Sequence, residues 1–264
     1  SPLCRILVGM TVCNLLSCEG SQKAAISAGA LQVLKIISTM EYPQLREASA
    51  RVIISLMKTK SLHAVLLRTA PIVPMLNYIL HNSNTREGPS KVESPIGENV
   101  SISGNIFDCA VNAMSCVAQS EEFRDHVYAS DGVQALVMSV LSGKVKSIDT
   151  ATEVIRTFCL LSYGYDSTPI LMEGQVMLAC LYLYRKGLVV PKSAEMICII
   201  IRNCATVPQC REELINSGAI LLMRGVYKPM VDRSIAIGRS IIIAVLEFSF
   251  EEENHDAMIQ HGVM

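Results

Sequence analysis

Apolar residues recur three and four positions apart through most of the chain, a spacing that places them on one face of an α-helix. The longest of these patterns predict helices over residues 2–16, 44–57, 106–119, 147–162, 191–205 and 231–249. Pro43 and Pro191 stand at or just before two of these starts, where proline suits the first turn of a helix. The pattern therefore predicts a chain built from helices.

A second pattern precedes the long helices: a short helical stretch, a glycine and a further apolar helix. The stretch CREELINSGAILLM from Cys210 shows it, and related stretches begin at Ser21, Glu122, Ser167 and Asn254. Their glycines are Gly29, Gly132, Gly174, Gly218 and Gly262. We expect glycine there because the turn needs a left-handed backbone, which a Cβ resists. The period of about 42 residues is typical of an all-helical solenoid.

The period divides the chain, taken as one solenoid over residues 1–264, into repeats of three helices. The expected repeats are 1–19 (partial), 20–60, 61–119, 120–164, 165–206, 207–250 and 251–264 (partial). Because the first and last repeats are partial, we expect this chain to be a piece of a longer array. Ala70, followed by Pro71, replaces the glycine of the 61–119 repeat. Residues 81–105 are rich in Ser, Gly, Pro and Asn and predict a disordered insert, either a passive loop or a segment regulated by phosphorylation.

These repeats resemble the armadillo family. Gly29-Ala30-Leu31 and Gly218-Ala219-Ile220 match the family's turn, and Asn14 and Asn203 stand in matching endings of third helices. The resemblance covers nearly the whole chain. It implies an all-α, right-handed α-solenoid with three helices per repeat, whose third helices line a concave groove that binds extended peptides.

In armadillo proteins such as importin alpha and beta-catenin, a groove Trp is followed four residues later by an Asn that bonds a peptide backbone. The matching pairs here are Met10/Asn14, Arg51/Ser55, Asn112/Cys116, Arg156/Leu160, Ile199/Asn203 and Ile243/Glu247. The chain has no Trp, and arginine at two of the Trp positions would repel a basic cargo. The resemblance thus implies a partner-binding groove formed by Asn14, Arg51, Ser55, Asn112, Arg156, Arg202 and Asn203.

Each of these residues also has a purely structural interpretation. Arg51, Arg156 and Arg202 either bind an acidic segment or are solvated and paired locally, as Arg156 could be with Glu153. Asn14 and Asn203 either bind a partner's backbone or bridge neighbouring helices.

Composition narrows the possible functions. Half of the 264 residues are hydrophobic, the net charge is −1, and no Trp offers a stacking platform for bases, so nucleic acid is not an expected partner. The ten cysteines include no CxxC pair, which indicates reduced thiols in a cytosolic or nuclear protein. Residues 169–184 are too interrupted by polar residues to predict a membrane span.

The sequence shows no catalytic motif and no histidine cluster with metal-ligand spacing, so we expect no enzyme, no metal and no cofactor. The predicted function is that of a cytoplasmic scaffold. Its third helices are expected to bind a partner protein through an acidic or extended segment of that partner. One alternative is a structural subunit fixed in a large cytoskeletal or ciliary assembly, bound to the rest of its own longer chain. The other alternative is a nuclear-import adaptor.

Overall fold

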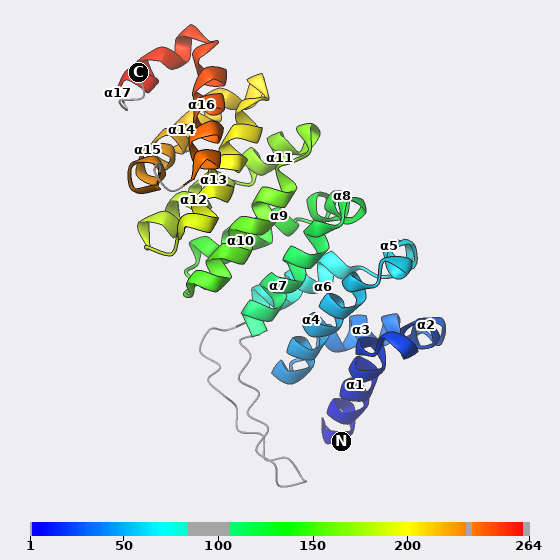
Figure 1. Ribbon diagram of the computed structural model, residues 1–264. Coiled ribbons are helices and arrows are strands. Elements are labelled where there is room, and N and C mark those ends of the chain that lie inside the picture. Colours follow the sequence, from blue (N-terminus) through cyan, green and yellow to red (C-terminus); the bar gives the residue numbers. More distant parts are fainter. Residues whose placement is uncertain (1, 84–105, 231–233, 261–264) are drawn as a thin grey trace. The chain divides into compact units, whose positions relative to one another are not determined.

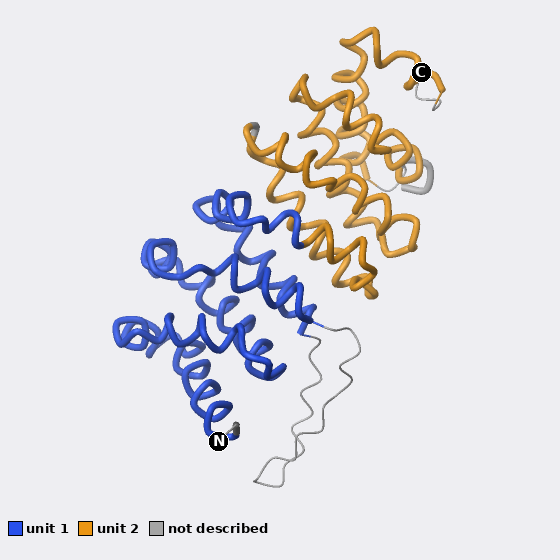
Figure 2. Tube along the Cα trace, turned by 180° about the vertical axis from the view of Figure 1, so that it is seen from behind, with its two compact units in different colours: residues 1–135 blue, residues 136–264 orange. Residues whose placement is uncertain are grey.

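The computed structural model describes residues 2–83, 106–230 and 234–260, and every regular element within these ranges is a helix. Its contacts divide the chain into two compact units, residues 1–135 and 136–264 (Figure 2). Nearly all of the predicted insert, the first residues of the helix predicted at 231–249, and Gly262 lie outside the described residues.

Unit 1 repeats the predicted order of a short, a second and a third helix. Its elements are α1 (Pro2–Ser17), α2 (Glu19–Ser27), α3 (Ala30–Ser38), α4 (Pro43–Lys58), η1 (Lys60–Leu62), α5 (His63–Thr69), α6 (Ile72–Asn82), α7 (Ile106–Gln119) and α8 (Glu121–Ala129). The third helices α1, α4 and α7 pack side by side (Figure 1), and the short helices α2, α5 and α8 follow them. The next helix, α9 (Gly132–Leu141), crosses the division between the units.

Unit 2 has the same order of elements. They are α10 (Ile148–Leu161), η2 (Tyr165–Ser167), α11 (Thr168–Glu173), α12 (Val176–Arg185), α13 (Pro191–Ala205), η3 (Pro208–Cys210), α14 (Arg211–Asn216), α15 (Ala219–Met230), α16 (Ile235–Ser249), η5 (Glu252–Asn254) and α17 (His255–Gln260). Its third helices α10, α13 and α16 pack in sequence, as α1, α4 and α7 do in unit 1. The helical pattern of the sequence is therefore confirmed in both units.

Helical spacing explains how the third helices pack. On α4, Leu45, Val52, Ile53 and Leu56 are fully buried, while Arg51 on the opposite face is exposed. Burying each large aliphatic side chain stabilises the fold by about 2 kcal/mol.

Among the described residues, no single helix is long and apolar enough to cross a bilayer, although two sharply bent helix pairs reach that length and composition when each pair is counted together.

The turns depart from the prediction in two repeats. Gly29 and Gly218 have the expected positive φ of 85° and 95°, but the left-handed residues of two other turns are Asp131 (φ 55°) and Gln175 (φ 60°). The placement of this conformation at Gly132 and Gly174 is therefore wrong by one residue. Gly132 begins α9, where a Cβ would lie 2.7 Å from Cγ1 of Val127, so this glycine permits close packing instead of the turn.

A side chain at the start of each repeat donates a hydrogen bond to a backbone carbonyl six residues earlier, at the end of the preceding third helix. These donors satisfy carbonyls that the helix itself leaves without partners. The bonds run from Gln22 to Leu16 (3.0 Å), His63 to Met57 (3.0 Å), Arg124 to Ala118 (2.9 Å), Ser167 to Leu161 (2.9 Å), Arg211 to Ala205 (2.8 Å) and Asn254 to Phe248 (3.3 Å). We call these six residues the cap donors.

Candidate functional site

The outer surfaces of the third helices of unit 1 hold four of the predicted groove residues. Asn14 lies on α1, Arg51 and Ser55 lie on α4, and Asn112 lies on α7. Asn14, Arg51 and Asn112 are exposed, and Ser55 is half-buried. Because α4 packs against both α1 and α7, the structure brings these residues onto three adjacent helices.

Arg51 is already paired within its own helix. Its Nη2 and Nε atoms donate to Oε1 of Glu47 at 2.7 and 3.1 Å, and this bond raises the pKa of the Arg51 guanidinium. The Glu47 side chain is 6% exposed, whereas 61% of the Arg51 side chain remains exposed. Glu47 therefore holds Arg51 in position, while most of the Arg51 side chain remains exposed to a partner.

Ser55 has an internal role. Its hydroxyl donates to the carbonyl of Ser17 at 3.0 Å and accepts from Nε2 of Gln22 at 3.2 Å. The oxygen of the same Gln22 amide accepts from the Thr59 hydroxyl at 2.9 Å. Ser55 therefore joins α4 to the end of α1 and the start of α2, so its hydroxyl is engaged within the fold.

The two exposed amides of unit 1 differ from Ser55. Within the described part of the chain, the side chains of Asn14 and Asn112 make no hydrogen bond, and both are exposed. An exposed amide on a helix can donate and accept at once, as the backbone of an extended peptide requires. These two residues are the groups of unit 1 best suited to bind a peptide backbone.

In unit 2 the predicted residues bond to one another. Nδ2 of Asn203 on α13 donates to the Ser162 hydroxyl at the end of α10 at 3.0 Å. Oδ1 of Asn203 accepts from Nη2 and Nε of Arg202 at 2.9 and 3.2 Å. Arg156 lies 3.8 Å from Glu153 on the same helix. The geometry of Asn203 is that of a bridge between helices, and Arg156 has a local acidic neighbour.

The sequence interpretation missed a cleft of about 740 Å³ in unit 1, where α4 and α7 end. His63, a buried cap donor, lines it together with Lys58, Lys60, Cys116 and Glu122. Since a carbonyl can only accept, the bond to Met57 places the His63 proton on Nε2, and Nδ1 lies 3.4 Å from the Ser120 hydroxyl. The signal in the sequence for the cap donors was a polar residue seven or eight positions before each described turn.

The thiols are structural in unit 2. None of the ten cysteines, all within the described residues, forms a disulfide, and burial raises the pKa of Cys159 to about 11 and that of Cys204 to about 12. The described residues contain no group of three or more His, Cys, Asp or Glu side chains arranged to hold a metal ion.

Comparison with known proteins identifies the fold. No protein-family model and no curated protein matches the sequence. A designed armadillo repeat protein solved in complex with the peptide (KR)4 is 13% identical, with a TM-score of 0.64 over 91% of each chain. An engineered protein from the Northeast Structural Genomics Consortium is 14% identical, with a TM-score of 0.68 over 96% of this chain and 56% of that one. This chain is thus an all-helical solenoid with armadillo-like repeats.

Proposed function

We propose that this protein is a non-enzymatic scaffold that binds an extended segment of a partner protein on the third helices of unit 1. The observation that supports it best is the pair of exposed amides of Asn14 and Asn112, on either side of the Arg51-bearing helix α4. An extended peptide has backbone donors and acceptors that need partners, and amides of this kind supply both.

The charges on this surface favour a partner segment that is acidic or neutral over a basic one. Arg51 and Lys58 are exposed on α4. The designed protein described above binds an alternating Lys-Arg peptide, and the exposed cations of α4 would repel such a peptide. Nuclear import of basic cargo is therefore the less favoured function. We propose that the scaffold acts in the cytoplasm.

The test is binding of a library of extended peptides, followed by variants of the surface measured by fluorescence anisotropy. Asn14→Ala and Asn112→Ala should each weaken a selected peptide about tenfold, the effect of losing one hydrogen bond. Arg51→Gln, which retains the length of the side chain, should weaken acidic peptides selectively. Unchanged affinity in all three variants would overturn the proposal.

The matched controls are Lys23→Gln on α2 and Arg185→Gln on α12, exposed cations outside the third helices. They should leave affinity unchanged. Because Asn14 and Asn112 make no hydrogen bond within the described residues, a loss of binding in their variants cannot be attributed to a loss of folding.

A structural subunit of a larger assembly is the second candidate, favoured by apolar side chains that face solvent on the outer helices. On α16, Ile242 and Leu246 are 68% and 54% exposed, and Phe250 directly after this helix is 67% exposed. On α1, Leu7 is 55% exposed. Permanent interfaces are large and apolar. Sedimentation velocity of the native chain and of an Ile242→Ser, Leu246→Gln variant tests this candidate. If the native chain is already monomeric at high concentration, or if the variant associates as the native chain does, this surface does not drive assembly.

A further inference from the structure

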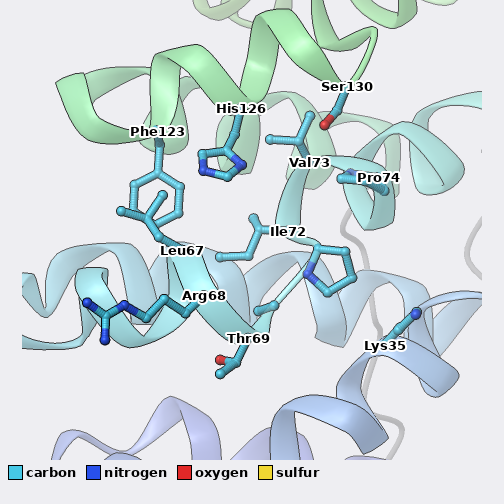
Figure 3. A pocket seen from close by; sticks show the side chains of 12 residues that line it. Lys35, Leu67, Arg68, Thr69, Ile72, Val73, Pro74, Phe123, His126 and Ser130 are labelled. Carbon is cyan, nitrogen blue, oxygen red and sulfur yellow. The ribbon is translucent and has the colours of Figure 1, made fainter.

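A second pocket in unit 1 lies away from the third-helix surface, between α5, α6 and α8, with a volume of about 380 Å³ (Figure 3). It is located at the repeat in which Ala70 replaces the turn glycine. Ala70 is extended, with φ −119° and ψ 122°, and Pro71 has φ −78° and ψ 63°. The amide of Ile72 donates to the Ala70 carbonyl at 2.9 Å, which completes an inverse γ-turn.

This turn gives the pocket a wall of fixed shape. Proline locks φ, so the chain at Pro71 loses little further freedom when a ligand binds. The other described turns between a short and a second helix use a left-handed residue instead, at Gly29, Asp131, Gln175 and Gly218. The break in the repeat pattern and the pocket thus coincide at the same residues.

The lining combines an apolar wall with cations. Leu67 and Pro71 are half-buried and Pro74 is exposed, whereas Ile72 and Phe123 are only 3% and 2% exposed. Lys35 and Arg68 are exposed at the edge of the pocket. Among the described residues that line it, none is acidic. The two cations therefore favour an occupant with a negative charge, and the apolar lining favours one that also has an apolar side chain.

We propose that this pocket binds a partner-protein segment in which a large apolar side chain is flanked by carboxylates. The apolar side chain contacts Leu67, Pro71 and Pro74, the apolar lining residues that remain accessible. The flanking carboxylates lie near Lys35 and Arg68, where each gains a charge-assisted contact at the rim. This site is separate from the third-helix surface and does not depend on the function proposed above.

The probe is a short fluorescein-labelled peptide with a central Asp-Phe-Asp, compared with Asn-Phe-Asn and Lys-Phe-Lys peptides of the same length. We expect Asp-Phe-Asp to bind at least about tenfold more tightly than either, since two carboxylates gain opposite charges at the rim. Methyl NMR spectra should show shifts at Leu67, Ile72 and Val73. Equal binding of the three peptides, or shifts confined to methyl groups of the third helices, would overturn the proposal.

Two independent variants locate the site. Lys35→Gln combined with Arg68→Gln should weaken Asp-Phe-Asp about tenfold because it removes both rim cations. Ala70→Leu should reduce binding by filling the pocket, since the extended backbone of Ala70 accepts any side chain. The control Arg185→Gln should bind as the native chain does, and thermal melting confirms that each variant is folded. Native affinity in both pocket variants would show that the peptide binds elsewhere.

Discussion

The two units use the asparagines of their third helices in opposite ways. In unit 1, Asn112 on α7 is exposed and makes no side-chain hydrogen bond within the described residues. In unit 2, Asn203 on α13 bonds both Arg202 and Ser162. An amide that bridges two helices stabilises the solenoid, whereas an exposed amide remains available to a partner.

The cap donors show the same contrast in their surroundings. Arg211 of unit 2 is buried, and besides its carbonyl it donates to Glu247 at 2.6 Å and Glu251 at 2.9 Å. Arg124 of unit 1 bonds the carbonyl of Ala118, and it forms no ion pair among the described residues. The Arg211 cap of unit 2 therefore includes two ion pairs that the Arg124 cap of unit 1 lacks, and the next prediction tests this difference.

The largest effect should follow Arg211→Met. This change leaves Glu247 and Glu251 without their cation and the Ala205 carbonyl without its donor, and should lower the free energy of unfolding by about 3 kcal/mol. Arg124→Met, its counterpart in unit 1, should lower it by only about 1 kcal/mol. Urea denaturation measures both. Equal losses would show that the ion pairs add nothing to the cap.

Valine at the glycine turns should have the next largest effect. Gly218→Val should destabilise by about 2 kcal/mol, because valine resists positive φ and its Cβ would lie 3.1 Å from Leu181. Gly29→Val meets no atom within 4 Å and should lose about 1 kcal/mol through φ alone. Unchanged melting temperatures in both variants would contradict the placement of these turns.

Alanine in place of the two asparagines sharpens the comparison directly. Asn203→Ala should lower the free energy of unfolding by about 1 to 2 kcal/mol, because Ser162 and Arg202 lose a half-buried partner. Asn112→Ala should change it by less than about 0.5 kcal/mol. If chemical denaturation finds the reverse order, the assignment of one residue to stability and the other to binding is wrong.

The smallest effect concerns thiol reactivity and leaves stability unchanged. Cys18 of unit 1 is exposed, and hydrogen bonding by Ser21 lowers the pKa of its thiol, whereas burial raises the pKa of Cys198 in unit 2 to about 12. Since the thiolate is the reactive form, iodoacetamide near pH 8 should label Cys18 well before Cys198. Peptide mass spectrometry reads the order of labelling, and Ser21→Ala should slow the Cys18 reaction.

Much of the fold is predictable from the sequence because it depends on local patterns. The apolar period predicts a helix over residues 44–57, and α4 spans Pro43–Lys58. The turn residues are harder to predict: glycine adjacent to a turn also serves close packing, so Gly132 resembles Gly29 in the sequence but differs in φ. The γ-turn at Pro71 has no glycine at all.

The site is less predictable because it depends on contacts between distant residues. Asn203 matches the peptide-binding asparagine of the family in sequence, yet its amide bonds to Ser162 at the end of the preceding third helix, a contact that no local pattern indicates. The cap donors escape detection for a different reason. Glutamine, histidine, arginine, serine and asparagine all serve the same function, so geometry is repeated while residue type is not.

The cap donors also determine how these repeats can be exchanged between proteins. The helical pattern suggests cutting after a third helix, but that cut would separate α13 from Arg211 and leave the Ala205 carbonyl exposed at the new end. A graft that extends through the next short helix keeps each third helix together with the residue that closes it. For engineering, the transferable module is therefore offset from the visible repeat by one short helix.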